Sequence, residues 1–280
     1  MTAHAAERSN VVPLPVAAPA EPQPPARAGH RFNVEGLVAV VAVLIAWEAA
    51  SAVLPPFLFP SIGTVAATTL EVLGDPAALG TVALTYARIV LWLAVAFAVS
   101  TALGIWAARR VRVDRALVPL IQLKQGIPGI CWAIFAIIWF EGMETRIAFV
   151  VVISTLPSLF FQARDGFRAI PHELWDMVRA LRPSRWAMAT RLVLPAMNPA
   201  MLTGLRINLG TAARVTITAE LLAGISGIGH HLRSAQEQFR MDIVLAWTVA
   251  IVLFVLLGDF AMSRVERYAL RWRRRPEDAR

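Results

Sequence analysis

The sequence predicts an all-α membrane protein with six transmembrane helices, and two observations support this fold class. First, the chain is 57% hydrophobic and only 16% charged over 280 residues, with a mean hydropathy of +0.59, which is too apolar for an ordinary soluble domain of this length. Second, the basic residues bracket apolar runs instead of lining one polar face. The formal charge of +8 therefore does not indicate a nucleic-acid-binding surface.

Apolar runs of about 20 residues, the length that a helix needs to cross a bilayer, define the predicted spans. They lie at 36–54, 81–108, 116–140, 147–163, 199–222 and 243–262. The third run contains Pro119, Lys124 and Pro128. Proline at membrane depth is tolerated where neighbouring helices or a water-filled cavity cover the freed backbone groups. We therefore expect the third span to be bent and to lie inside the bundle.

The ends of the chain and one internal loop are polar. The predicted organisation is a disordered Pro/Ala-rich tail at 1–32, a transmembrane domain at 33–272 that includes a charged loop at 171–195, and a basic tail at 273–280. With the N-terminus inside, the inner segments carry 20 of the 27 basic residues. The positive-inside rule then places both termini and the 171–195 loop in the cytoplasm.

The 171–195 loop has the pattern of two short helices. Pro171 suits the first helical position, and apolar residues recur at helical spacing on one face. These residues are Leu174, Met177, Val178 and Leu181. Arg182 ends this helix because the residue before a proline avoids the helical region, and Ser184 can cap a second helix. The pair is predicted to lie along the cytoplasmic surface, either as a docking surface or as interfacial helices resting on lipid headgroups.

The spacing from Asp176 through Arg182 to the Leu192-Val193-Leu194-Pro195 segment resembles the EAA loop of ABC importer permeases. That pattern reads Glu-Ala-Ala, three residues, Gly, nine residues, then Ile-x-Leu-Pro. Arg88 in LTYARIVLWL, the TGLRINLG segment and Gly227-Ile228-Gly229 are similar to the nitrate, sulfonate and taurine group of type I importer permeases. This resemblance implies the type I ABC importer permease fold and a non-catalytic pore subunit in the bacterial inner membrane.

The resemblance also implies partners and a coupling site. Its members work with cytoplasmic ATPase subunits, a second permease subunit of the same or a different chain, and a periplasmic or lipid-tethered binding protein. By position, the ATPase-coupling residues would be Asp176, Met177, Val178, Arg179, Ala180, Leu181, Arg182, Pro183 and Ser184. This chain would bind no cofactor itself, and ATP and Mg would be held by the partner. Indeed its only lysine, Lys124, is followed by Gln125 and cannot complete a Walker phosphate-binding loop.

The centre of the loop departs from the family pattern. The Glu-Ala-Ala triplet reads Asp176-Met177-Val178, and Arg182 replaces the glycine. An arginine before proline favours an extended conformation, whereas glycine takes the left-handed conformation that closes a helix. We therefore expect a turn of different geometry. One hypothesis is that the chain is the divergent member of an unequal permease pair.

Charged residues within the predicted spans are the remaining candidates, because a charge at the bilayer centre is costly and faces a cavity or a partner. They are Glu48, Arg88, Lys124, Arg206, Arg214, Glu220 and Asp259. Arg88, Arg206, Arg214 and Glu220 are candidates for the translocation path, and internal ion pairs are the alternative. Arg214 stands where the family usually has an aromatic or apolar residue, which makes it a candidate for attracting an anion.

Two functions of different classes follow from the sequence. One is an ABC importer permease for a small anion such as nitrate, a sulfonate or taurine. The other is a self-contained secondary transporter or channel that uses the membrane charges directly. No metal-ligand spacing is present, since His230 and His231 are adjacent and have no carboxylate or thiolate cluster around them.

Overall fold

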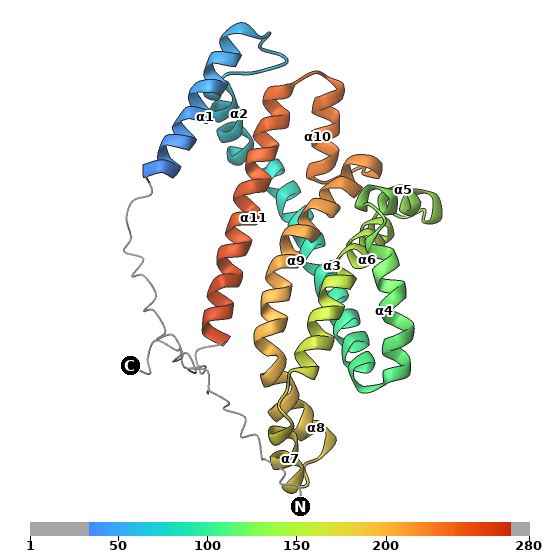
Figure 1. The fold of residues 1–280 in the computed structure, drawn as a ribbon. Coiled ribbons are helices and arrows are strands. Elements are labelled where there is room, and N and C mark those ends of the chain that lie inside the picture. Colours follow the sequence, from blue (N-terminus) through green and yellow to red (C-terminus); the bar gives the residue numbers. More distant parts are fainter. Residues whose placement is uncertain (1–33, 270–280) are drawn as a thin grey trace, which may run out of the picture. The chain divides into compact units, whose positions relative to one another are not determined.

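The computed structural model describes residues 34–269, and these residues form helices and connecting turns without a strand (Figure 1). The helices are α1 (Val34–Val53), α2 (Ile62–Gly74), α3 (Pro76–Arg109), α4 (Val111–Gln125), α5 (Gly129–Trp139), α6 (Met143–Arg168), α7 (His172–Ala180), α8 (Arg185–Met188), the π-helix η1 (Ala189–Val193), α9 (Leu194–Ala223), α10 (Ile228–Glu237) and α11 (Met241–Ala269). The predicted tails at 1–32 and 273–280 lie outside the described residues.

The chain divides within α1, after Val43. The first unit contributes residues 34–43 to the described part, and none of them is buried. The packing that follows is that of the second unit, from Leu44 onward.

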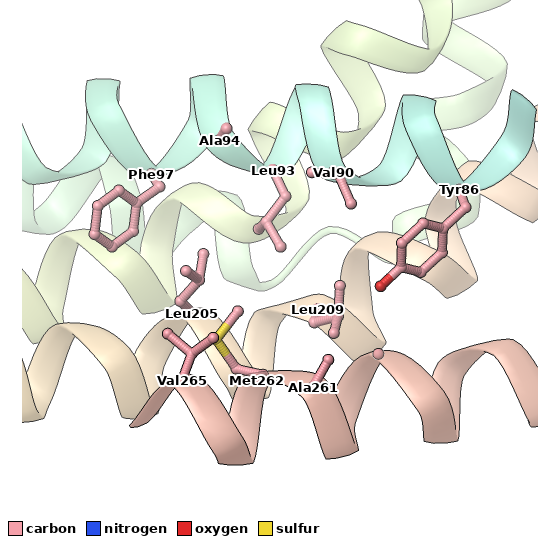
Figure 2. A pocket seen from close by; sticks show the side chains of 11 residues that line it. Tyr86, Val90, Leu93, Ala94, Phe97, Leu205, Leu209, Ala261, Met262 and Val265 are labelled. Atoms are coloured by element: carbon pink, nitrogen blue, oxygen red, sulfur yellow. The ribbon is translucent and has the colours of Figure 1, made fainter. Parts of the chain in front are cut away.

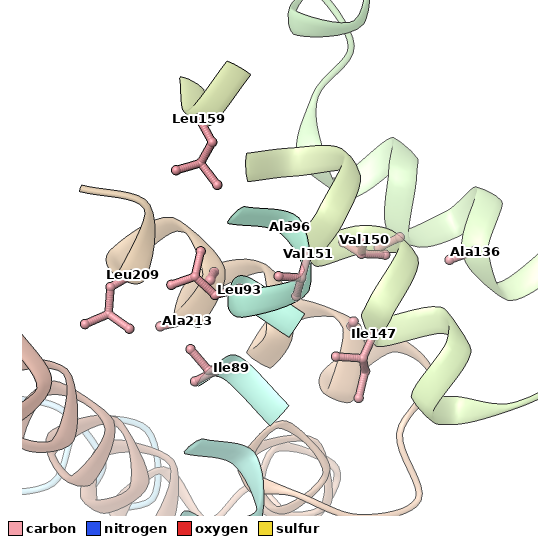
Figure 3. Close-up of a cluster of buried hydrophobic side chains, with 13 residues drawn as sticks. Ile89, Leu93, Ala96, Ala136, Ile147, Val150, Val151, Leu159, Leu209 and Ala213 are labelled. Carbon is pink, nitrogen blue, oxygen red and sulfur yellow. The ribbon is translucent and has the colours of Figure 1, made fainter. Parts of the chain in front are cut away.

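The core of the second unit is the contact of α3, α6 and α9. Figure 3 shows its buried aliphatic cluster, which includes Ile89, Leu93, Ile147, Val150, Val151, Leu159 and Leu209 together with several alanines. Small residues let helix backbones approach closely, which is how membrane helices gain packing contacts. Gly104 of α3 is an example, because a Cβ there would lie 2.7 Å from the Cβ of Ala163 on α6. The core therefore fixes α9 along much of its length.

The predicted spans correspond to helices of the structure. Four helices, α1, α3, α6 and α11, are long and apolar enough to cross a membrane, and the bent pair α4 and α5 passes the same test only when the two helices are taken together. Helix α9 covers the predicted fifth span with 30 residues but does not meet this test of length and composition. The all-α membrane fold is confirmed, whereas the count of six spans remains a prediction.

The third predicted span is broken where the sequence placed its prolines and glycines. Helices α4 and α5 meet at an angle of 99° across the Gly126–Pro128 turn. Only Ile121, Ala133 and Ala136 of the two helices are buried. The expected bend is confirmed, but the expectation that this span lies inside the bundle is wrong for the single chain. Pro119, Gly126 and Pro128 are exposed, so the single chain does not cover the backbone groups that these residues leave free.

Candidate functional site

Helix α7, the first helix of the predicted coupling loop, has two apolar faces. Trp175 and Val178 pack against a buried cluster at this end of the bundle. Met177 and Leu181 are 59% and 79% exposed, and Asp176 is exposed beside them. The four apolar residues predicted to share one face are thus divided, with Val178 turned inward and Met177 and Leu181 presented outward. The outward face is available to a partner.

The turn after α7 corrects the expectation for Arg182. Its φ angle is 46°, in the left-handed region, so the predicted extended conformation and different turn geometry are wrong. The N–H of Leu181 donates to the carbonyl of Val178 at 3.2 Å, and that of Arg182 to the carbonyl of Arg179 at 2.9 Å. These tight bonds close the helix in the way that glycine normally permits. The need to end α7 and return to α8 overrides the local preference before Pro183.

The second predicted helix forms where Ser184 was expected to cap it. The Ser184 hydroxyl accepts the N–H of Ala187 at 3.1 Å, which satisfies one free donor of the first turn. The backbone then stays helical through α8, η1 and α9, since Met188, Val193 and Leu194 all have right-handed helical angles. Residues 185–223 therefore form one helical segment that links the loop to the far end of α9 (Figure 1).

The π-helix η1 has a local cause in the sequence. Pro195 has no N–H, and in a regular α-helix its ring would clash with the carbonyl four residues earlier. The N–H of Leu194 instead donates to Ala189, five residues back, so the extra residue of the π turn is accommodated just before the proline. The Leu192–Pro195 segment thus interrupts the regular α-helical hydrogen-bond pattern where the loop joins the membrane domain.

The opposite end of α9 carries the most deeply buried charge of the chain among residues 34–269. Glu220 has 0% exposure. Its carboxylate accepts from the Arg88 guanidinium at 2.8 Å, from the Thr85 hydroxyl at 3.0 Å and from the backbone N–H of Gly229 at 3.1 Å. A buried carboxylate must be paired and hydrogen-bonded in this way, because an unpaired one would be strongly disfavoured.

Arg88 extends the network from Glu220 to two other segments. Its Nη2 lies 2.7 Å from Glu144 Oε1 and donates to the Ser226 hydroxyl at 3.1 Å. Thr85 also accepts the N–H of Ile228 at 3.0 Å. The network therefore ties α3, the start of α6, the end of α9 and the turn into α10 together.

Three glycines around Glu220 make this arrangement possible. Gly227 has a φ of +98°, and a Cβ there would collide with the Glu220 carboxylate. A Cβ at Gly229 would lie 2.5 Å from the carbonyl of Ile217, and one at Gly224 would meet the Glu220 backbone. The glycines thus let the turn wrap around the carboxylate and present the backbone N–H of Gly229 to it.

The other charges within the predicted spans are separate from this network. Arg206 pairs with Asp259 of α11 at 2.7 Å, and both side chains are partly exposed. Arg214 is exposed, and its side chain donates to the Thr211 hydroxyl at 3.1 Å. It has no acidic partner among the described residues. Of the four path candidates, the structure brings Arg88 and Glu220 together and leaves Arg206 and Arg214 apart.

A cavity of about 290 Å³ lies between α3, α9 and α11 (Figure 2). Its lining is apolar apart from the Tyr86 hydroxyl, which approaches Gly258 so closely that a Cβ there would be 2.7 Å away. None of the four path candidates lines it. This cavity is therefore suited to apolar groups and does not gather the charges that a small anion would need.

Sequence reasoning missed several members of the buried network. Thr85, Glu144 and Ser226 were not candidates, because a hydroxyl or an acid near a helix end is common and carries no signal alone. Helices α2 and α10 were also missed. For α2 the signals are present, since Ser61 accepts the N–H of Thr64 at 3.2 Å, which is typical of a helix N-cap. Asp75, directly after α2, caps the start of α3 by accepting the N–H of Ala77 at 2.9 Å.

Comparison with known proteins identifies the family. Residues 100–271 match the model of the binding-protein-dependent transport system inner membrane component family. The chain belongs to this family. The match covers more than half of the chain, including the loop and all of α9, and it establishes an integral membrane protein of such a transport system.

Individual relatives agree with this assignment. A bicarbonate transport system permease protein of Synechococcus elongatus is 30% identical over 186 residues, which are 66% of each chain. The taurine transport system permease protein of Escherichia coli is 27% identical over 189 residues, 68% of each chain. In an inward-facing structure of the MetNI methionine ABC transporter, one chain is similar with a TM-score of 0.61 at 15% identity, over 70% of this chain and 99% of that one. This last likeness confirms the type I importer permease fold.

Proposed function

We propose that this chain is the transmembrane permease subunit of an ATP-binding-cassette importer for a small anion of the nitrate, sulfonate or taurine kind. It works as a pore subunit without enzyme activity of its own. Cytoplasmic ATPase subunits bind ATP and Mg, a second permease subunit completes the path, and a periplasmic or lipid-tethered binding protein delivers the solute. Both termini and the α7–α8 loop face the cytoplasm.

The observation that carries this proposal is the outward face of α7 and its connection to α9. Met177 and Leu181 are exposed on a short helix whose other face is anchored to the bundle. An exposed apolar face beside charged residues is typical of a protein–protein contact. Helices α8, η1 and α9 are continuous. A displacement of the loop by a partner subunit is therefore transmitted to α9, which carries Arg214 and Glu220.

Arg214 is the residue of the path that we assign to attraction of the anion. Arg88, Glu220 and Arg206 are all engaged in ion pairs, so they hold helices together and offer little net charge to a solute. Arg214 carries an exposed charge without an acidic partner among the described residues. Arg214→Ala is expected to lower uptake of the transported anion, whereas Arg214→Lys, which keeps the charge, is expected to retain most of it.

The test of the proposed function is co-purification of the tagged full-length chain from its native cells in mild detergent. We expect an ATPase subunit to be retained, and Met177→Glu to reduce its recovery at least tenfold by placing a charge in the apolar contact. Val111→Glu is the matched control, because Val111 is also exposed (62%) at the start of α4 but lies outside the loop. Equal ATPase recovery with both variants, or uptake by the chain without an ATPase, would contradict the proposal and favour a secondary transporter.

A further inference from the structure

An open cleft of about 700 Å³ lies at the coupling-loop end of the bundle. It is bounded by the last turn of α3, the end of α6, helix α7 and the start of α8. The side chains that matter for its chemistry are Arg109, Phe167, His172, Trp175, Arg179 and Arg185. Met177 and Leu181 do not line it, so the cleft is distinct from the outward face of α7.

Aromatic rings hold two of the arginines in place. The Arg109 guanidinium carbon lies 5.2 Å from the centroid of the Phe167 ring, and that of Arg179 lies 5.6 Å from the Trp175 ring. The two rings are themselves 5.5 Å apart. A guanidinium stacked on a ring keeps its N–H groups free for an oxygen ligand. The wall of the cleft is thus a row of two rings with an arginine at each end.

The charge of the cleft is not balanced from within. Its lining contains three arginines and a histidine and no acidic residue. Arg109 and Arg185 form no ion pair among the described residues, and Arg179 reaches Asp176 only at 3.8 Å with both side chains exposed. Elsewhere at this end, by contrast, Asp114 pairs with both Arg164 and Arg168. The cleft therefore has an uncompensated positive potential that favours an anionic ligand.

The position of Arg109 indicates where that ligand comes from. Arg109 is the last residue of α3, one of the helices long and apolar enough to cross the membrane. The cleft therefore opens at the level where the apolar part of a span ends and lipid headgroups begin. Basic pockets between membrane helices at this level suit anionic headgroups.

We propose that this cleft binds the phosphate of an anionic phospholipid headgroup. Arg109 and Arg185 contact the phosphate from two sides, and the Phe167 and Trp175 rings pack against the apolar part of the lipid near the headgroup. A lipid held there connects the end of α3 to α7 and α8 and steadies the loop against the bundle. This site is independent of which solute the protein transports.

The test is native mass spectrometry of the purified full-length chain titrated with phosphatidylglycerol, with phosphatidylcholine and with inorganic phosphate. The Arg109→Gln, Arg185→Gln double variant removes both unpaired charges. The matched control is Arg112→Gln, Arg115→Gln, which removes two exposed charges of α4 outside the cleft. Because each basic residue contributes about fivefold to binding of an anionic lipid, we expect the cleft variant to lose phosphatidylglycerol roughly 30-fold, while the control loses much less.

Four outcomes would overturn this assignment. Equal losses in the cleft and control variants would show that phosphatidylglycerol is attracted by general surface charge. Equal binding of phosphatidylcholine would show that the anionic charge is not recognised. Displacement of the lipid by millimolar inorganic phosphate would show that the cleft binds a free anion. A thermal melt of each variant separates loss of lipid from loss of folding, and retention of wild-type binding by a folded cleft variant would also refute the site.

Discussion

The two ends of α9 are built in opposite ways. At one end Glu220 is fully buried and is held by a charged guanidinium, a hydroxyl and a backbone N–H from segments far apart in the sequence. At the other end α9 continues through a π-helix into an exposed loop whose first helix, α7, has no buried residue. One end is fixed to the bundle by polar interactions, and the other is attached to it by a cluster of apolar side chains that includes Leu192, Val193 and Met197.

A helix that is held firmly at one end and can move at the other is able to transmit movement from a partner. A segment that is fixed at both ends cannot respond to a partner, and one that is loose at both ends cannot pass the response on. Local opening is easiest where few apolar contacts are buried, which describes α7, since none of its residues is buried. If the proposed coupling is right, we expect the buried network to be the fixed point against which a displacement of the loop tilts or bends α9.

The largest expected effect comes from breaking the fixed end. Glu220→Ala leaves the Arg88 guanidinium buried without its carboxylate partner and is expected to destabilise the protein by about 3–5 kcal/mol, on the order of 10 °C in Tm. The measurement is a thermal unfolding curve in detergent. Asp259→Asn, which breaks the partly exposed pair with Arg206, is the control and is expected to shift Tm far less. Equal shifts would show that burial of the network contributes nothing.

A smaller loss is expected from the turn that wraps around Glu220. Gly227→Ala combines a backbone φ of +98° with a Cβ that collides with the Glu220 carboxylate, and we expect a cost of about 2 kcal/mol. Gly80→Ala in α3 is the matched control, since a Cβ there meets nothing within 4 Å and alanine favours the helix. The same thermal curves decide the matter, and an unchanged Tm for Gly227→Ala would contradict the described turn.

At the loop end a substitution is expected to stabilise the protein. Arg182 has a left-handed φ that costs a residue with a Cβ about 1 kcal/mol or more. Arg182→Gly removes this strain and restores the family residue, so we expect a slightly higher Tm and ATPase association at least equal to the wild type. Arg182→Ala retains the strain and serves as control. Loss of ATPase association in Arg182→Gly would show that the arginine itself contributes to docking.

The smallest expected effect concerns the cap of α8. Ser184→Ala removes the acceptor for the N–H of Ala187 and is expected to cost about 1 kcal/mol, whereas Ser184→Asn can still accept this bond and is expected to be near neutral. Circular dichroism melts measure the difference. If the comparison between the ends is right, neither variant disturbs the Glu220 network, and proteolysis of the 224–228 turn stays at the wild-type rate.

The sequence predicted the parts of this fold that depend on local patterns. Apolar runs of membrane-spanning length located α1, α3, α6 and α11, and the Pro171–Ser184 spacing located both helices of the loop. These features depend on the hydropathy or the capping chemistry of neighbouring residues. The break between α4 and α5 belongs to the same class, because prolines and glycines mark it directly.

The parts that could not be predicted depend on tertiary structure. The pairing of Arg88 with Glu220 joins residues 132 positions apart, and no local pattern selects Glu220 over another acid. The left-handed conformation of Arg182 contradicts its local preference because the chain must turn between the end of α7 and the start of α8. The exposed position of α4 and α5 was missed because prolines and glycines mark a bend but do not determine whether other helices of the same chain cover it.

Hydrogen–deuterium exchange along α9 tests the central claim most directly. The full-length chain is measured in nanodiscs with and without its ATPase partner. We expect slow exchange at residues 220–229 under both conditions, and fast exchange at residues 172–188 that slows when the ATPase binds. Similar protection of both segments in the free chain, or an ATPase-dependent change confined to residues 220–229, would contradict the assignment of a fixed end and a movable end.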